Sequence, residues 1–348
     1  MSTLDIQRDV PLAPLTTLGL GGPAKHFVRV ENEQSVLDAL SWAADRELRV
    51  AVLGGGSNLI VPDAGYDGLV IQMGIGDLEL RNGGRARVGA GVPWETVVEN
   101  AVSRGWAGVE CLTGIPGSTG ATPIQNVGAY GQEVSEVIER VHVVRRDTLE
   151  HEEIASAECG FSYRDSLFKR DRARFIVTAV DFALRPGGPA TIRYAELANH
   201  IAPGGSLGDV RDTVLALRRR KSMLIDPSDP NRRSAGSFFL NPIVSSVEAA
   251  SLAERAAREG LVDSPEEVPR YPTDGDRTKL AAGWLIEKAG IEKGTRRGPI
   301  GVSTKHALSL VHHGGGTTTE LLAFAADIRR RVHDRFGVML EREPRLLE

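Results

Sequence analysis

Residues 49–58 read RVAVLGGGSN, a short apolar run that ends in three consecutive glycines, a serine and an asparagine. The apolar and β-branched residues predict a strand at 49–53, and the glycines after it let backbone amides approach an anion closely. Ser57 and Asn58 add side-chain donors. The spacing fits neither G-x-G-x-x-G nor G-x-x-x-x-G-K-[ST], so it indicates neither a Rossmann domain nor a P-loop. Taken alone, the segment fits a phosphate-binding loop and a flexible turn equally well.

A second glycine-rich segment, residues 111–132, contains GIPGSTG at 114–120 and PIQNVGAYG at 123–131. It has no helical or strand periodicity, and a loop of this length inside a compact domain is usually functional. Its many backbone amides carry little side-chain bulk, which suits a large flat or phosphorylated ligand. Two such loops in one domain favour a dinucleotide-sized cofactor over the alternative, a purely structural Ω-loop.

Around these loops, hydrophobic periodicity predicts a chain that mixes strands and helices without a regular βαβ alternation. Strands are expected at residues 27–30, 69–71, 86–89, 137–144, 175–184 and 191–194. Helices are expected at residues 33–47, 92–104, 209–220, 247–258, 279–289 and 317–335. Thr317 and Glu320 have the spacing of a capping box for the last helix. The Pro- and Gly-rich residues 185–189 predict a linker, with a domain boundary near residue 188.

Composition excludes several classes of protein. The 348 residues include 42 Lys and Arg against 46 Asp and Glu, so the basic excess of a nucleic-acid or membrane-surface binder is missing. Cys111 and Cys159 can form neither a disulfide framework nor a zinc site, which fits a reducing compartment. No metal site is predicted from the histidines. With no signal peptide and no apolar run of about 18 residues, we expect a soluble, cytoplasmic protein with no membrane segment.

Other motifs have ordinary structural explanations. Residues 313–316, His-Gly-Gly-Gly, imitate the oxyanion loop of esterases, but they lie near the C-terminus before a helix, so a turn is expected. Residues 234–242 lack the spacing of a hydrolase nucleophile elbow. Arg164, within Phe161-Ser162-Tyr163-Arg164-Asp165-Ser166, fits a surface ion pair when taken alone. Residues 218–221, Arg-Arg-Arg-Lys, end a helix, where solvated cations are common, and phosphate binding is the alternative for one or two of them.

Taken in order, these segments resemble the UDP-N-acetylenolpyruvoylglucosamine reductase family over nearly the whole chain. The matching segments are Thr17-Leu18-Gly19-Leu20-Gly21-Gly22-Pro23-Ala24, both glycine loops, Tyr163-Arg164-Asp165-Ser166, Gly236-Ser237-Phe238-Phe239, Lys279-Leu280-Ala281-Ala282-Gly283-Trp284-Leu285-Ile286 and Leu340-Glu341-Arg342-Glu343. Residues 191–197 resemble the subtype that carries an extra tyrosine-bearing substrate loop. The resemblance implies an α+β fold: a FAD-binding domain of the p-cresol methylhydroxylase (PCMH) or vanillyl-alcohol oxidase type at 20–188, then a smaller substrate domain at 206–348 whose tail returns to the active site.

The resemblance also implies cofactors and binding residues. FAD would be held non-covalently and reduced by NADPH, in a protein expected to be a monomer. The expected cofactor-binding residues are Gly54, Gly55, Gly56, Ser57, Asn58, Leu59, Gly114, Ile115, Gly117, Ser118, Gly120, Asn126, Gly128, Ala129 and Arg218. The expected substrate-binding residues are Tyr194, Lys221, Asn241, Lys279 and Arg345.

By the same resemblance, the substrate is an enol ether conjugated to a carboxylate, and its reduction gives UDP-N-acetylmuramate for peptidoglycan synthesis. Arg164 and Glu343 would stabilise charge on the carboxylate, and Ser237 would deliver the proton to the α-carbon. Glu343 can donate a hydrogen bond only when protonated, which requires a raised pKa in a dry pocket. Spacing favours Glu343 over Glu341.

One residue departs from the family pattern. Pro344 stands where the family usually has valine, and proline removes a backbone donor and restricts φ, which could change how Glu343 and Arg345 approach the site. Two rival functions stay open on the sequence. One is another PCMH-type flavin oxidase or dehydrogenase acting on a sugar or an alcohol. The other is a non-catalytic nucleotide-sugar binder.

Overall fold

The computed structural model describes residues 4–202, 204–273 and 275–348, and its chain divides into two compact units. Unit 1 contains Pro23–Gly56 and Gly65–Ile225, together with the N-terminal residues through Leu15. Unit 2 contains Thr16–Gly22, Ser57–Ala64 and Asp226–Glu348. Two short early segments therefore fold with the C-terminal residues, and the first glycine loop changes unit after Gly56.

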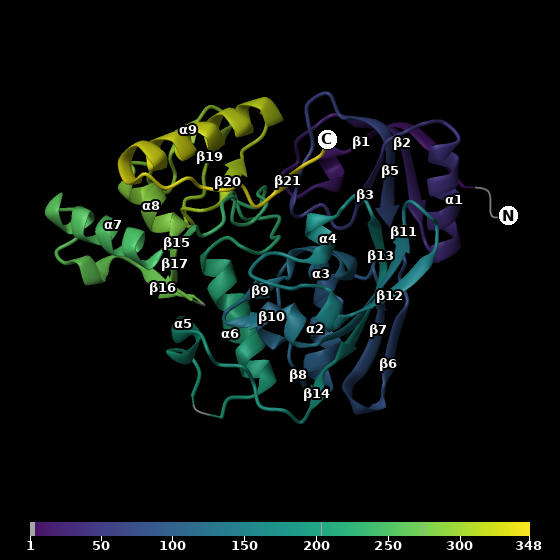
Figure 1. Cartoon of the computed structure of the whole chain (residues 1–348), viewed down its shortest axis with the longest axis horizontal. Coiled ribbons are helices and arrows are strands. Elements are labelled where there is room, and N and C mark those ends of the chain that lie inside the picture. The colour runs from purple at the N-terminus through teal and green to yellow at the C-terminus, as the bar shows by residue number, and fades with distance from the viewer. Residues whose placement is uncertain (1–3, 203, 274) are drawn as a thin grey trace. The chain divides into compact units, whose positions relative to one another are not determined.

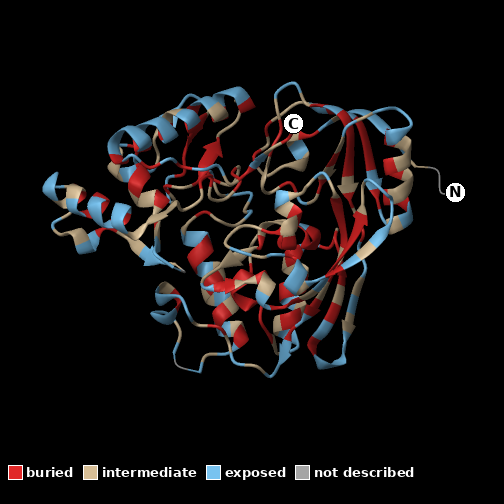
Figure 2. Cartoon of the chain, in the orientation of Figure 1, coloured by how far each residue is buried: buried red, intermediate tan, exposed pale blue. Residues whose placement is uncertain are grey.

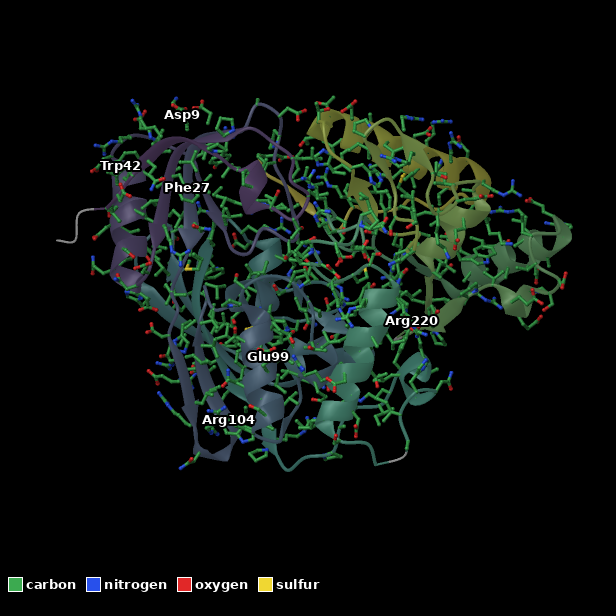
Figure 3. All side chains as sticks on the ribbon, turned by 180° about the vertical axis from the view of Figure 1, so that it is seen from behind. Asp9, Phe27, Trp42, Glu99, Arg104 and Arg220 are labelled. Carbon is green, nitrogen blue, oxygen red and sulfur yellow. The ribbon has the colours of Figure 1, made fainter. Side chains whose placement is uncertain are left out.

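The first sheet of unit 1 is four-stranded and mixed (Figure 1). In spatial order its strands are β1 (Gln7–Pro11), β2 (Pro23–Val30), β5 (Tyr66–Met73) and β3 (Val50–Leu53). Strands β2 and β3 run parallel to β5, whereas β1 runs antiparallel to β2. Helix α1 (Glu33–Ala44) follows β2 and begins at an Asn32 cap, with Val36 and Leu40 buried. Figure 3 labels Phe27 on β2 and Trp42 on α1.

The second sheet of unit 1 is antiparallel throughout. In spatial order its strands are β12 (His151–Ala155), β11 (Ile138–Arg145), β13 (Phe175–Ala183), β7 (Arg85–Gly89) and β6 (Leu78–Arg81). Buried apolar residues of both sheets, of α1 and of α2 (Trp94–Ser103) form one hydrophobic core (Figure 2). Trp94 is fully buried there, and its indole Nε1 donates to Leu112 O at 3.0 Å.

Unit 1 also contains the following elements. They are β8 (Trp106–Ala107), α3 (Thr122–Gln125), β9 (Gly128–Ala129), β10 (Gln132–Glu133), α4 (Leu167–Arg170), β14 (Arg185–Pro186), α5 (Ala195–Ala198) and α6 (Leu207–Arg220). Helix α6 packs Val210, Val214 and Leu217 against Cys111 and Leu197. Because of this packing, unit 1 continues to Ile225, so the structural units divide the chain differently from the predicted domain ranges 20–188 and 206–348, which remain a prediction.

Unit 2 contains two small antiparallel sheets and three longer helices around its own core. One sheet has the order β15 (Ile243–Ser245), β17 (Arg277–Leu280), β16 (Arg270–Pro272), and the other β18 (Arg296–Arg297), β19 (Ile300–Val302), β20 (Leu310–His312). The helices are α7 (Ser246–Arg258), α8 (Ala282–Lys288) and α9 (Thr318–Phe336). Strands β4 (Leu59–Ile60) and β21 (Arg345–Leu346) pair in parallel. No helix among the described residues is long and apolar enough to cross a membrane.

Most predicted elements are confirmed, and two are wrong. Residues 191–194 form no strand, because the backbone N–H and C=O of Thr191 bond to the side chains of Glu110 and Cys111 instead of a neighbouring strand. Residues 279–289 are not one helix. Lys279 pairs with Ile243 and Tyr271 in the sheet of β17, and the helix begins only at Ala282.

The predicted start signal of the last helix is confirmed. Thr317 and Glu320 form the capping box of α9. The segment before α9 is a turn, as predicted, with Gly314 and Gly315 at positive φ and the Gly316 N–H donating to Nε2 of the buried His312 at 3.1 Å.

The segment Ser57–Ala64 is joined to α9 through the carbonyl of Val61, which accepts from Thr318 Oγ1 at 2.6 Å, and through the carboxylate of Asp63. Its oxygens accept from Thr318 N at 2.7 Å, Thr319 N at 2.9 Å and Thr319 Oγ1 at 2.6 Å. Burial alone would raise the pKa of Asp63, but the hydrogen bonds from Thr319 and Thr318 outweigh it and hold the pKa below its usual range. A negative charge at the N-terminus of a helix is also favoured by the helix dipole.

We expect Asp63→Ala to lower the free energy of unfolding by about 1 kcal/mol at pH 7, the usual effect of removing a capping side chain. Because the pKa of folded Asp63 is depressed, its stabilisation is complete above about pH 4 and is lost as the pH falls through the folded pKa. Denaturant unfolding at pH 7 and at lower pH checks this. The difference between wild type and variant should shrink in acid, and the exposed Glu254→Ala on α7 serves as the control.

Candidate functional site

The two glycine loops lie backbone against backbone in unit 1. A Cβ added to Gly55 would lie 2.7 Å from the Cα of Gly117, and one added to Gly54 would lie 2.5 Å from Ser118 Oγ. At Gly55 the neighbouring atoms are backbone, so the approach of the two loops leaves no room for a side chain there, whereas at Gly54 the Ser118 hydroxyl would have to move. The second loop also needs positive φ at Gly114 (+69°) and Gly117 (+132°). The predicted pairing of both loops in one site is therefore consistent with their packing.

Backbone and side-chain bonds hold the second loop in place. Trp94 N donates to Gly117 O at 3.0 Å, and Thr119 N donates to Val92 O at 2.8 Å. Gly120 packs closely on Ala90: a Cβ added to Gly120 would lie 2.5 Å from the Cβ of Ala90. These bonds tie the loop to the segment between β7 and α2, so its amides are pre-positioned.

Gly114 depends on a carboxylate that is itself held by a cation. Glu95 on α2 accepts from Thr113 Oγ1 at 2.7 Å and from Gly114 N at 2.5 Å. Arg211 on α6 donates to Glu95 at 3.1 Å and to Glu99, labelled on α2 in Figure 3, at 2.9 Å. No local sequence pattern points to Glu95, because its role depends on how α2, α6 and the loop meet.

Arg218, a predicted cofactor residue, is a buried cation beside this loop. Only 7% of it is exposed, and a Cβ on Gly114 would lie 3.2 Å from its Nε. One guanidinium nitrogen donates to Met223 O at 2.9 Å, but Nε has no hydrogen-bond partner among the described residues. Burial lowers the pKa of the guanidinium. A buried donor without an acceptor is costly, so this position suits a ligand that supplies one.

The structure brings three other predicted residues together. Arg164, with the left-handed φ of +54°, donates to Asn126 O at 3.3 Å and to Gly128 O. Asn126 is buried, and its amide donates to Glu133 at 2.8 Å and to Ser162 O at 3.0 Å. The Asn126 side chain therefore links parts of the loop around Arg164 to one another. The predicted Ile115 and Ala129 pack, partly buried, against the core of unit 1.

An aromatic pair and a cation form a neighbouring group in unit 1. The rings of Tyr130 and Tyr194 meet edge to face, with centroids 5.7 Å apart, and Lys221 Nζ lies 5.8 Å from the Tyr130 centroid. Lys221 also pairs with Glu196 on α5. Burial raises the pKa of Tyr130 to about 12, so its phenol stays protonated at neutral pH. Tyr194 and Lys221 were predicted, whereas Tyr130 and Glu196 were not assigned roles.

In unit 2 the C-terminal tail runs beside the segment that contains Ser237. Leu240 N donates to Glu341 O at 2.9 Å, and Glu343 N donates to Phe238 O at 3.0 Å. Phe238 and Phe239 are fully buried, whereas Ser237 and Glu343 are half-buried. The tail thus brings Glu343 beside the residue that follows Ser237, although more than a hundred positions separate them in the sequence.

The tail continues along the end of the first glycine loop. Arg345 N donates to Asn58 O at 3.0 Å and Leu347 N to Ile60 O at 2.8 Å, which brings the predicted Asn58, Leu59 and Arg345 together. The backbone N–H groups of residues 343, 345 and 347 donate to neighbouring segments, so residue 344 between them needs no N–H. Pro344 therefore fits here without the loss of a ladder bond.

The two remaining predicted substrate residues lie in the sheet region of unit 2. Asn241 Oδ1 accepts from Ala282 N at 2.9 Å and so caps α8. Lys279 Nζ lies 6.0 Å from the centroid of Tyr271, its neighbour across β17 and β16. Asn241 thus has a structural function that sequence reasoning missed.

The predicted site residues divide between the two units. Unit 1 contains Gly54, Gly55, Gly56, Gly114, Ile115, Gly117, Ser118, Gly120, Asn126, Gly128, Ala129, Arg164, Tyr194, Arg218 and Lys221. Unit 2 contains Ser57, Asn58, Leu59, Ser237, Asn241, Lys279, Glu343 and Arg345.

Comparison with known proteins identifies the family of the chain. Residues 24–150 match the model of a FAD binding domain, and residues 227–347 match the model of the UDP-N-acetylenolpyruvoylglucosamine reductase C-terminal domain. The chain is 47% identical to the UDP-N-acetylenolpyruvoylglucosamine reductase of Thermobifida fusca, over 98% of each chain. It is 44% identical to the reductase of Streptomyces avermitilis, over 97% of this chain and 93% of that one.

A solved structure agrees with the sequence relatives. The crystal structure of the reductase from Thermus caldophilus is 26% identical, with a TM-score of 0.69 over 99% of this chain and 100% of that chain. From full-length identity and both matching domain models, the chain belongs to the UDP-N-acetylenolpyruvoylglucosamine reductase family.

Proposed function

We propose that Arg164, Ser237 and Glu343 carry out the chemistry of the family's reaction in this chain. The chain is a FAD-dependent oxidoreductase that reduces UDP-N-acetylglucosamine enolpyruvate to UDP-N-acetylmuramate with NADPH, a step of peptidoglycan precursor synthesis. The backbone bond from Glu343 N to Phe238 O carries the proposal for the residues, because it supports a joint role for Ser237 and Glu343 in one unit.

The residues of unit 1 fit a bound FAD. The face-to-face glycine loops present backbone amides with no side chain to block a ligand, which suits a pyrophosphate. The buried Nε of Arg218 suits an acceptor on the cofactor ring. When bound, FAD supplies the electrons that it has received from NADPH. Gly54, Gly55, Gly114, Gly117 and Arg218 are therefore proposed to hold the cofactor.

Reduction of an enol ether conjugated to a carboxylate builds negative charge on the carboxylate oxygens and the α-carbon. The Arg164 guanidinium is pre-oriented by the carbonyls of Asn126 and Gly128, so it need not reorganise as this charge develops. A protonated Glu343 would add a second hydrogen-bond donor. We assign these two residues to stabilising the carboxylate.

The α-carbon then needs a proton, and we assign it to the Ser237 hydroxyl. A serine is a weak acid, so its donation depends on exact positioning against a strongly basic carbon. The buried neighbours Ala235 and Phe238 hold the backbone on both sides of Ser237, and Gly236 adopts the positive φ of +71° that this turn requires.

The other predicted residues are proposed to bind the nucleotide sugar. Tyr194 and Lys221 offer an aromatic face and a cation beside Tyr130, which suits a sugar or base next to a phosphate. Asn241 and Lys279 would contact the substrate, and Arg345 would meet the diphosphate. The monomeric state, the cytoplasmic location and the tyrosine-loop subtype stay predictions from the sequence.

The cofactor proposal predicts a steric effect at Gly55. We expect Gly55→Ala to weaken FAD binding at least about tenfold, because the new methyl group would displace the Gly117 backbone. Gly76→Ala is the matched control, since a Cβ there lies 3.7 Å from its nearest neighbour. Fluorescence titration of the apoprotein with FAD measures both affinities. Equal affinities would contradict the proposed contact of the loops with FAD.

The proton-donor proposal predicts a selective kinetic defect. Ser237→Ala should leave flavin reduction by NADPH intact and slow reoxidation by the enolpyruvyl substrate by about 10²–10⁴-fold, the usual contribution of a general acid. Anaerobic stopped-flow absorbance separates the two half-reactions. Ser237→Cys keeps an acidic proton and should retain more activity. Equal loss of both half-reactions in Ser237→Ala would rule out this role.

The Glu343 proposal predicts a ranking of two variants. Glu343→Gln keeps a neutral donor and should retain more activity than Glu343→Ala, for which we expect a loss of about 10²–10³-fold. The rate of substrate-dependent flavin reoxidation provides the comparison. If the two variants were equally impaired, Glu343 would not act as a hydrogen-bond donor.

A further inference from the structure

Thr191 is held at every polar atom by three buried side chains of unit 1. Its N–H donates to Glu110 Oε1 at 2.8 Å, and its Oγ1 accepts from Gln132 Nε2 at 3.0 Å. Its carbonyl accepts from Cys111 Sγ at 3.2 Å. Burial raises the pKa of the Cys111 thiol to about 12, so the S–H remains available to donate. We call Glu110, Cys111, Gln132 and Thr191 the Thr191 anchor.

The anchor is internally connected and almost sealed from solvent. Glu110 and Cys111 are fully buried, Gln132 is 1% exposed and Thr191 is 6% exposed. Gln132 Oε1 accepts from Cys111 N at 2.9 Å, and the second carboxylate oxygen of Glu110 accepts from Gly108 N at 2.7 Å. Burying the Glu110 carboxylate costs desolvation energy. Both of its oxygens accept from backbone amides, and one of these amides, that of Thr191, lies 81 positions away in the sequence.

The anchor lies at the start of the segment that carries Tyr194. Three residues after Thr191, the Tyr194 ring meets Tyr130, and Glu196 then pairs with Lys221. Between them, Arg193 donates to Gly131 O at 3.3 Å and pairs with Glu136 at 2.9 Å. Residues 191–194 have no strand partner, so their register depends on side chains.

We propose that Glu110 is a positioning residue for substrate recognition, acting through Thr191 to hold Tyr194 and Glu196 in register with Tyr130 and Lys221. This rests on the proposed substrate contacts of Tyr194 and Lys221. A shift of Thr191 by one residue would turn Tyr194 away from Tyr130, because side-chain direction changes with each residue of an extended segment. The anchor therefore determines affinity for the nucleotide sugar, whereas residues 114–120 are held by other bonds, to Glu95, Trp94 and Val92.

The first test is Glu110→Gln in the FAD-loaded full chain. Glutamine keeps the size of the side chain, but its NH₂ group would face the backbone N–H of either Thr191 or Gly108. One hydrogen bond is then lost, because two donors face each other. We expect the KM for UDP-N-acetylglucosamine enolpyruvate to rise about tenfold or more. FAD content and the rate of flavin reduction at saturating NADPH should stay within about twofold of wild type.

Thr191 provides an independent pair of variants. Thr191→Val removes only the hydroxyl that accepts from Gln132 and should also raise the KM, whereas Thr191→Ser keeps it and should restore the wild-type KM. Asp147→Asn is the matched control, because Asp147 also accepts a backbone amide, that of Thr148 at 3.0 Å, but in the hairpin between β11 and β12. An unchanged KM in Glu110→Gln and Thr191→Val would overturn the proposal. So would a parallel loss of FAD and of both half-reactions.

Hydrogen exchange tests the anchor without the reaction. The Thr191 amide should exchange slowly in wild type, and Glu110→Gln should accelerate exchange at residues 191–198 but leave residues 114–120 unchanged. Accelerated exchange in both segments would mean that Glu110 supports unit 1 generally, and would contradict a specific role. If the enolpyruvyl substrate did not reoxidise the wild-type flavin, the proposed function would fail. The exchange pattern would still test whether Glu110 holds residues 191–198 in place.

Discussion

The approach of Gly54 and Gly55 to Gly117 and Ser118 is the constraint on which the proposed cofactor site depends. The first loop follows the half-buried strand β3, and the second is bonded to the segment between β7 and α2. Any side chain at Gly55 would push the Gly117 backbone away. The two loops can approach each other because their glycines have no Cβ atoms. Beside the second loop, the carbonyl groups of Asn126 and Gly128 hold Arg164, and burial holds Arg218.

Unit 2 aligns its proposed site residues by a different means, a tail that donates hydrogen bonds from alternate residues. Glu343 pairs with Phe238, Arg345 with Asn58 and Leu347 with Ile60, so one short segment aligns the proposed proton donor, the proposed carboxylate ligand and the end of the first glycine loop. The alternation also explains why Pro344 is tolerated. Its missing N–H falls on a position where the ladder uses none, so the departure from the family pattern leaves the tail in place.

Side chains replace backbone pairing around residues 191–196. Where a strand was expected, the main chain of Thr191 bonds to Glu110 and Cys111, and the next residues depend on ion pairs and an aromatic contact. The register of this segment therefore depends on its particular side chains, because no neighbouring strand sets it. The same substitution of side chains for backbone occurs at Asn241, whose oxygen caps α8.

The sequence by itself determined the two glycine loops, the longer helices, the capping box of α9 and, through resemblance, the family and its reaction. These follow from local periodicity and from ordered motifs, which need no knowledge of distant contacts. Only the tertiary structure decided that Lys279 lies in a strand, that α6 packs with Cys111 and Leu197, and that Glu110 reaches Thr191. Pairing of segments far apart in the chain overrides local propensity, because buried donors and acceptors must find partners wherever the fold supplies them.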